Sequence, residues 1–169
     1  MKVLIISTAR CGSTSLMKNI AKEKNLKPIF EPFNFRQDNK TQYTTDLDDI
    51  VVKTLVGQYP HSSDTLDING LVEWESWICE FIKEFDDVIL LTRKNHIAAA
   101  ESFSVASYSD DSWFDTYVYK KLPNLELSKK HLYYTNRFLF NVFHRTKIPV
   151  QYYEDIFDEN SKDRLRVLN

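Results

Sequence analysis

The sequence predicts an α/β protein in which a central parallel sheet is covered by helices on both faces. Short apolar runs rich in valine, isoleucine and leucine alternate along the chain with longer segments that have the apolar spacing of helices. The runs do not alternate apolar with polar residues, which is typical of parallel strands buried on both faces. A chain of 169 residues has the length of one domain, so we expect a single three-layer α/β/α unit over residues 1–169.

The first half of the chain contains two of the expected strands and one helix. Residues 2–8 form an apolar, β-branched run that predicts a buried strand, and a helical pattern follows over residues 13–24. Residues 28–35 include two prolines, too many for a central strand, so we expect a short extended segment or a loop there. Residues 50–56 are predicted as the second buried strand, in which Lys53 is unusual because lysine is rarely buried.

The second half of the chain continues the alternation of helix and strand. Each expected helix has apolar residues three or four positions apart, and each expected strand is a short apolar run. In chain order we expect a helix over residues 73–85, a strand over 88–91, helices over 96–106 and 125–145, a strand over 149–153 and a closing helix over 158–168.

Polar residues follow three of the predicted strands at the points where the strands end. Ligands of parallel α/β sheets bind outside the carboxyl ends of the strands. We therefore expect residues 8–15, 53–54 and 92–95 to line a single crevice at that edge of the sheet.

The charge and cysteine content exclude several classes of partner and site. Lysine and arginine number 22 against 24 aspartate and glutamate residues, a net charge of −2, so we expect no nucleic-acid or membrane partner. The two cysteines can form at most one disulfide, and no cysteine and histidine spacing indicates zinc. The opening apolar run is too short for a signal peptide, and no run approaches 18 apolar residues. A cytoplasmic setting is expected.

The stretch Arg10-Cys11-Gly12-Ser13-Thr14-Ser15 lies between a strand and a helix, an arrangement that is typical of an anion-binding loop. The first N–H groups of a helix have no partner within the helix, and the helix dipole adds partial positive charge there. Arg10 adds a full charge with a geometry suited to phosphate or sulfate. Gly12 allows close approach of a ligand to the backbone, and three hydroxyls follow it. The alternative is an ordinary capped turn from strand to helix.

Three familiar phosphate-binding patterns do not fit this loop. A Walker A loop requires a glycine-lysine pair before serine or threonine, which is absent here. A cysteine-dependent phosphatase needs an arginine about six residues after its cysteine, but Met17 stands there, so Cys11 is not expected to be a nucleophile. A dinucleotide fingerprint needs three spaced glycines, and only Gly12 is present.

The loop resembles that of sulfotransferases that use 3′-phosphoadenosine 5′-phosphosulfate (PAPS), in which a segment like Arg10-Cys11-Gly12-Ser13-Thr14 grips the 5′-phosphosulfate. The resemblance continues where a strand ends at Thr92 and is followed by Arg93, Lys94 and, on the next helix, Ser102. In the family an arginine and a serine eight residues later hold the 3′-phosphate. Ser102 lies eight residues after Lys94 and nine after Arg93, so either cation is a candidate for that role.

Two weaker similarities support the resemblance, which extends from residue 3 to about residue 157. Glu31-Pro32-Phe33 is similar to a segment of the carbohydrate-type and bacterial members, and Tyr153-Glu154-Asp155-Ile156 is similar to a late segment of theirs. The resemblance implies an α/β/α fold of the P-loop nucleotide-binding type, PAPS as cofactor with adenosine 3′,5′-bisphosphate as product, and no metal requirement. The chain is short for the family, so we expect contacts made by a longer C-terminal region to be absent or replaced.

The resemblance also implies a transfer reaction in which a carboxylate removes the proton of the acceptor. Glu31 is the expected base, because its apolar neighbours disfavour the charged form of a carboxyl; the alternative is a surface glutamate in a proline-rich turn. Arg10 is expected to neutralise the leaving phosphate. Lys53 would contact the sulfonate, the acceptor or a structural carboxylate. Leu55 follows Lys53-Thr54 where the small-alcohol branch of the family has a histidine.

Three functions remain open at this point. The first is a sulfotransferase acting on a hydroxyl or amine of a small or carbohydrate-like acceptor, for which Phe30, Phe33 and Phe35 would admit a sugar, a phenol or a lipid. The second is a nucleotide or small-molecule kinase with a degenerate phosphate loop. The third is a member of the family that binds the nucleotide without catalysis.

Overall fold

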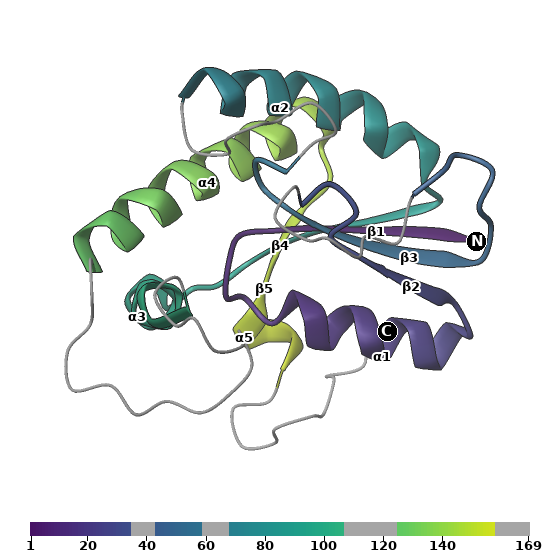
Figure 1. The fold of residues 1–169 in the computed structure, drawn as a ribbon, viewed down its shortest axis with the longest axis horizontal. Coiled ribbons are helices and arrows are strands. Elements are labelled where there is room, and N and C mark those ends of the chain that lie inside the picture. The colour runs from purple at the N-terminus through teal and green to yellow at the C-terminus, as the bar shows by residue number, and fades with distance from the viewer. Residues whose placement is uncertain (35–42, 59–67, 107–124, 158–169) are drawn as a thin grey trace.

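The computed structural model describes residues 1–34, 43–58, 68–106 and 125–157, and its centre is a five-stranded parallel sheet. The strands are β1 (Lys2–Ser7), β2 (Lys27–Phe30), β3 (Ile50–Leu55), β4 (Asp87–Thr92) and β5 (Val150–Tyr152). Their order across the sheet is β2-β3-β1-β4-β5, and every neighbouring pair is parallel. The first strand is therefore the central one, and all five carboxyl ends meet at one edge (Figure 1).

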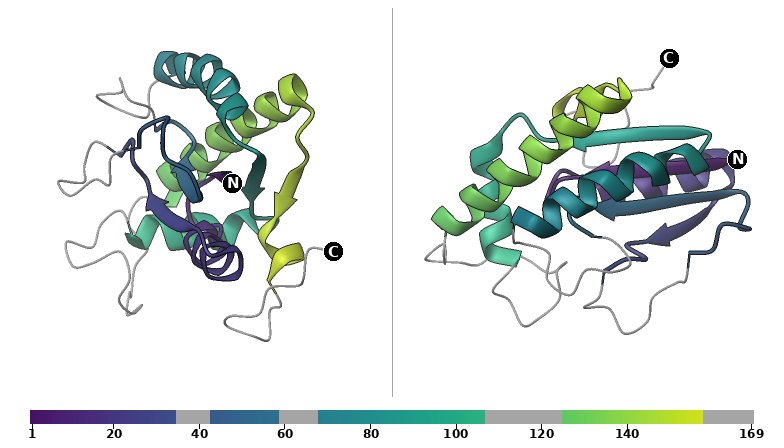
Figure 2. Two further views of the ribbon diagram at one scale, coloured as in Figure 1. Left: turned by 90° about the vertical axis from the view of Figure 1, so that its right-hand side faces the viewer. Right: turned by 90° about the horizontal axis from the view of Figure 1, so that it is seen from above.

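Helices cover both faces of this sheet. Those of the described residues are α1 (Ser13–Lys24), α2 (Ile68–Phe81), α3 (His96–Ala106), α4 (Leu125–Thr146) and the short α5 (Tyr153–Ile156), with a 3-10 turn η1 (Ile82–Glu84) after α2. Figure 2 shows α2 and α4 on one face of the sheet and α1 and α5 on the other. The third helix lies beyond the carboxyl ends of the strands and packs against α4. The predicted α/β/α layering is confirmed.

Successive residues of the central strand enter opposite cores, as the two-residue period of a strand requires. Leu4 and Ile6 are buried with Trp74 of α2 and Leu139 of α4. Val3 and Ile5 are buried on the other face in a second core, whose other members include Leu16, Ile20, Val51, Leu91 and Ile156. Burial on both faces explains why this strand is a continuous apolar run.

Two of the predicted elements differ in the structure, and a third cannot be compared with it. Within residues 28–35, where a short extended segment or loop was expected, β2 pairs with β3 as an edge strand, a position in which a proline such as Pro28 is tolerated. The helix expected over residues 73–85 already includes residue 68, and it ends at Phe81, where η1 begins. The closing helix expected over residues 158–168 lies outside the described residues.

Candidate anion-binding site

The loop between β1 and α1 has the backbone geometry of an anion cradle. Arg10 and Gly12 have φ angles of +61° and +75°, so the chain turns sharply on left-handed residues before the helix. Gly12 occupies the N-cap of α1, no side chain caps the helix, and its first turn holds no acidic residue. The N–H groups at this end are therefore directed at a position where no carboxylate of the helix competes with a bound anion.

The buried side chain of Cys11 anchors the loop to the core. Its side chain is fully buried, and Sγ donates to the carbonyl oxygen of Thr8 at 2.9 Å across the turn. Burial raises the pKa of this thiol and keeps it protonated. Cys11 thus offers only its backbone to the cradle, in agreement with the expectation that it is not a nucleophile.

The three hydroxyl residues of the loop differ in their exposure to solvent. Ser13 is buried, Thr14 is half-buried and Ser15 is exposed. Because a ligand approaches from solvent, Thr14 and Ser15 are more accessible to it than Ser13.

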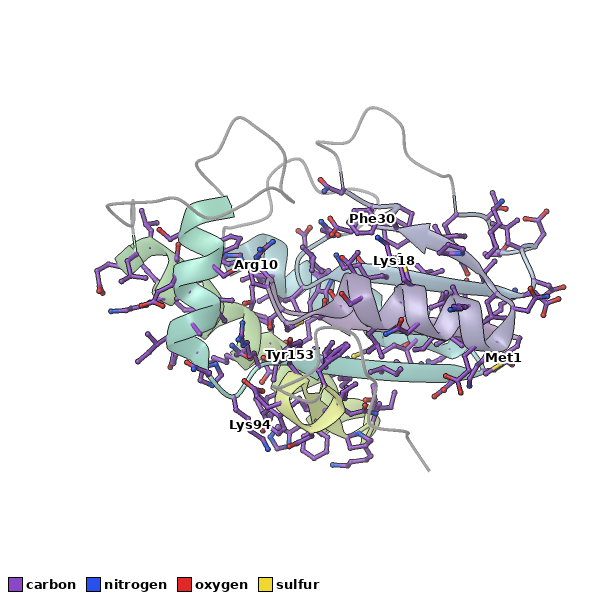
Figure 3. The ribbon with its side chains drawn as sticks, turned by 90° about the horizontal axis from the view of Figure 1, so that it is seen from below. Met1, Arg10, Lys18, Phe30, Lys94 and Tyr153 are labelled. Atoms are coloured by element: carbon purple, nitrogen blue, oxygen red, sulfur yellow. The ribbon has the colours of Figure 1, made fainter. Side chains whose placement is uncertain are left out.

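The structure joins the two predicted motifs through a direct contact. Arg10 Nε donates to Ser102 Oγ of α3 at 2.8 Å, although 92 residues separate them in the sequence. Figure 3 shows Arg10 at the beginning of α1, on the side nearest α3. The loop cation and the helix serine therefore belong to one site at the carboxyl edge of the sheet.

Below this contact, hydrogen bonds between side chains hold the ends of β1 and β4 together. The Thr8 and Thr92 hydroxyl oxygens are 3.1 Å apart, and Thr92 donates onward to Asn136 Oδ1 of α4 at 2.5 Å. The Thr8 N–H also donates to the carbonyl oxygen of Leu91 at 3.1 Å. The loop thus starts from a position fixed by the neighbouring strand.

Arg93 and Lys94, the two candidates for the 3′-phosphate, contact carboxylates of α5. Glu154 accepts from the Lys94 N–H at 2.8 Å and the Asn95 N–H at 3.0 Å, and Arg93 Nε lies 3.6 Å from its Oε1. The Lys94 ammonium pairs with Asp155. One of these carboxylates thus occupies the backbone donors at the start of α3, where an anion would otherwise be held, and the partners that the structure gives Arg93 and Lys94 lie on α5.

Tyr153 lies directly against the loop. A Cβ atom built on Gly12 would come within 2.5 Å of Tyr153 Cε2, and the Arg93 guanidinium lies 5.0 Å from the centroid of the same ring. Only glycine fits at position 12, first because of its φ angle and second because of this ring.

Glu31 and Lys53, the two other predicted catalytic residues, form a buried ion pair with each other. The second carboxylate oxygen of Glu31 accepts from Asn34 Nδ2 and from Gln58 Nε2, each at 2.9 Å. The Lys53 ammonium also lies 4.5 Å from the centroid of the Phe30 ring. Of the three contacts expected for Lys53, the structure contains the one with a carboxylate.

This ion pair lies on the same face of the sheet as the loop. Lys53 is two residues from Val51, which is buried in the core beneath α1 together with Cys11. The charge of Lys53 opposes the effect of burial on the Cys11 thiol by lowering its pKa, which indicates that the two residues are close. The predicted catalytic pair and the anion cradle are therefore neighbours.

The aromatic residues expected to form an acceptor surface are not brought together. Phe30 packs on the core beneath α1, whereas Phe33 packs on the core beneath α2, where its ring centroid is 5.0 Å from that of Trp77. Phe35 lies outside the described residues. The expectation of one aromatic cluster is wrong for Phe30 and Phe33, because the chain crosses the sheet edge between them.

The sequence analysis did not identify Asn34, Gln58 and Tyr153 as parts of the site. Asn34 and Gln58 complete the hydrogen bonds of Glu31, and Tyr153 fixes the position of the loop. The sequence did contain a signal for Asn34 and Gln58. A lysine in a buried strand requires a carboxylate as its partner, and a buried carboxylate requires further hydrogen-bond donors.

The sequence matches no family model, and no curated protein is significantly similar to it. In the described parts of the chain no cluster of three or more histidine, cysteine, aspartate or glutamate residues could hold a metal ion. None of the helices in those parts has both the length and the apolar character needed to cross a bilayer.

Proposed function

We propose that the protein is a PAPS-dependent sulfotransferase with a fold of the P-loop nucleotide-binding type. The hydrogen bond from Arg10 Nε to Ser102 Oγ carries the proposal, because it brings together the two segments that resemble the phosphate-binding motifs of that family. The left-handed Gly12, the absence of a side-chain cap and the absence of acidic residues in the first turn of α1 fit a phosphosulfate at the loop.

PAPS, when bound, supplies the sulfuryl group and a phosphate leaving group. Arg10 and the N–H groups at the start of α1 bind the anion and neutralise the charge that develops on the leaving phosphate. Thr14 and Ser15 add hydroxyl donors from the exposed side of the loop. Arg10 and Ser102 lie close enough to share a second anion, and Arg93 or Lys94 would join them only after release from Glu154 or Asp155.

Glu31 is the proposed base for the acceptor. Lys53, Asn34 and Gln58 hold its carboxylate in one orientation, and three donors leave about one of its four acceptor positions for the proton of an incoming hydroxyl or amine. Lys53 positions this carboxylate. The acceptor is proposed to be a small or carbohydrate-like molecule.

Binding of adenosine 3′,5′-bisphosphate tests the nucleotide site. Ligand at a hundred times its dissociation constant should stabilise the protein by about 2.7 kcal/mol, read as a rise in the melting temperature without metal. Arg10→Ala should abolish the rise, whereas Lys18→Ala, which removes an exposed cation from α1, should retain it. Equal responses of the two variants would contradict the assignment of the loop.

Transfer of labelled sulfate from PAPS to a panel of hydroxyl and amine acceptors tests the chemistry. Glu31→Gln should lower turnover by about 10²-fold or more and leave bisphosphate affinity unchanged. Glu23→Gln, at an exposed position of α1, is the matched control and should keep full activity. A response to ATP and Mg²⁺ in place of the bisphosphate would favour a kinase, and binding without transfer would favour a non-catalytic nucleotide-binding protein.

A further inference from the structure

A groove between the beginning of α3 and the middle of α4 lies on a different flank of α3 from the anion-binding loop, although Asn136 of its lining accepts from Thr92 beneath that loop. Its volume is about 540 Å³, within the range of roughly 300–1,000 Å³ that is usual for small-molecule sites. Ile97 lines the groove, and Ser102 lies near the loop. Ser102 comes five positions after Ile97 on α3, which places the two residues about 140° apart around the helix axis. The groove and the loop therefore lie on different flanks of α3.

The walls of the groove are mainly apolar. Ile97 of α3 faces Leu132, Tyr133 and Phe140 of α4. Ile97 is 63% exposed and Tyr133 is 64% exposed, which is high for large apolar side chains. Apolar surface concentrated in a concave site, and not scattered singly, indicates a place where a ligand is bound.

The charges around the groove are of one sign. Lys129 and Arg137 belong to its lining, and the residues that the structure places there include no aspartate or glutamate. Lys129 pairs with Glu126, outside the lining. Within the described chain, Arg137 forms no ion pair. The groove thus combines an apolar wall with two cationic side chains.

We propose that this groove binds an amphipathic anion, that is, a molecule with an acyl chain or aryl ring and one carboxylate, sulfate or phosphate group. The apolar part would lie between Ile97 and Phe140, and the anionic group would lie near Arg137. A neutral apolar ligand would leave Arg137 without an anionic partner, and a multiply charged polar ligand would leave the apolar wall exposed. The proposal does not depend on the proposed sulfotransferase activity.

Displacement of 1-anilinonaphthalene-8-sulfonate from the full chain tests this proposal. Decanoate and decyl phosphate are the anionic probes, and decanol is their neutral counterpart. We expect at least one of the two anions to bind ten times more tightly than decanol, and the tighter one identifies the preferred head group. Equal affinities for the alcohol and both anions, or no binding of any of them, would overturn the proposal.

Two matched aspartate variants locate the binding. Ile97→Asp places a negative charge in the groove, whereas Leu127→Asp places one on a side chain that is also 63% exposed, in the first turn of α4 and outside the groove. Ile97→Asp should weaken binding of the anions at least tenfold, and Leu127→Asp should change it less than twofold. Equal effects of the two variants would place binding elsewhere and overturn the proposal.

A third variant tests the charge of the groove separately from its shape. Arg137→Gln should weaken binding of the anions about tenfold and leave binding of decanol unchanged. Circular dichroism and the midpoint of urea denaturation check that each of the three variants is folded. A loss of decanol binding equal to the loss of anion binding would overturn the proposed role of Arg137.

Discussion

Lys53 and Glu31 form an ion pair that joins the carboxyl ends of β3 and β2 inside the protein. Their side chains are only 4% and 8% exposed. The parallel register places Phe30 opposite Lys53, so Glu31 follows directly beside the lysine, and its N–H donates to the Lys53 carbonyl oxygen at 2.8 Å. Both charges are removed from water, and each depends on the other for its compensation.

Lys53→Met should therefore destabilise the protein strongly. The substitution leaves the Glu31 carboxylate buried with only two amide donors, for which we expect a loss of about 3–5 kcal/mol in the free energy of unfolding. Urea denaturation measures the change. The double variant Lys53→Met/Glu31→Gln removes both charges and should be more stable than Lys53→Met alone. A double variant that loses the sum of the two single effects would contradict the coupling of the pair.

Gly12→Ala should destabilise the loop through two separable effects. A left-handed alanine costs about 1–2 kcal/mol, and the new Cβ would displace the Tyr153 ring at an additional cost. In a Tyr153→Ala background the first effect should remain, together with a lesser contact of 3.3 Å with the Phe157 ring. Chemical denaturation of the four proteins of this cycle measures the coupling. An equal cost of Gly12→Ala in both backgrounds would mean that the ring does not press on the loop.

The elements that depend on local signals were predicted closely. The apolar runs predicted β1, β3 and β4, and the helical spacing predicted α1 with the observed ends and α4 within one residue. Each of these depends on patterns that are complete within about twenty residues, so the sequence contains what is needed to recognise them.

The elements that depend on pairing between distant segments could not be predicted in the same way. The second strand is defined by its register with β3, about 23 residues further along, and not by its own four residues. The sequence analysis identified Glu31 and Lys53 as two separate candidates, because only the register of β2 and β3 makes them partners. The same holds for Tyr153, which follows β5 and comes near Gly12 because β5 pairs with β4, the neighbour of β1.

The rule that parallel strands end at one edge was the most useful guide to the site. It predicted that the loop after β1 and the segment after β4 lie together, and the contact between Arg10 and Ser102 agrees with it. It could not predict that Arg93 and Lys94 face α5, because the direction of a side chain after a strand depends on which carboxylates are packed nearby.

The Cys11 thiol should react slowly in the folded protein. Its side chain is buried and its pKa is raised by burial, so neither access nor ionisation favours alkylation. In Cys79→Ala, which leaves Cys11 as the remaining thiol, iodoacetamide at pH 8 should react on the order of 10²-fold more slowly than with the chain unfolded in urea. Mass spectrometry follows the adduct, and rapid modification of the folded variant would show that the thiol is accessible.

Glu154→Gln should destabilise the beginning of α3 in a pH-dependent manner. Burial alone would raise the pKa of Glu154, but hydrogen bonds from the Asn95 and Lys94 N–H groups, with Arg93 nearby, outweigh burial and lower it. A lowered pKa in the fold means that the carboxylate stabilises the protein above its unfolded pKa of about 4.5 and loses this effect as the pH falls.

We therefore expect wild type to exceed Glu154→Gln by about 1–2 kcal/mol at pH 7, because charge-assisted hydrogen bonds to two N–H groups are lost. The difference should stay constant down to about pH 5 and then shrink as Glu154 becomes protonated. Glu126→Gln is the matched control, since Glu126 is exposed and its ion-pair partner in the described part of the chain is Lys129, three residues away, and it should cost well under 1 kcal/mol. Urea denaturation from pH 3.5 to 7.5 measures all three proteins, and a difference that grows toward low pH would contradict the role given to Glu154.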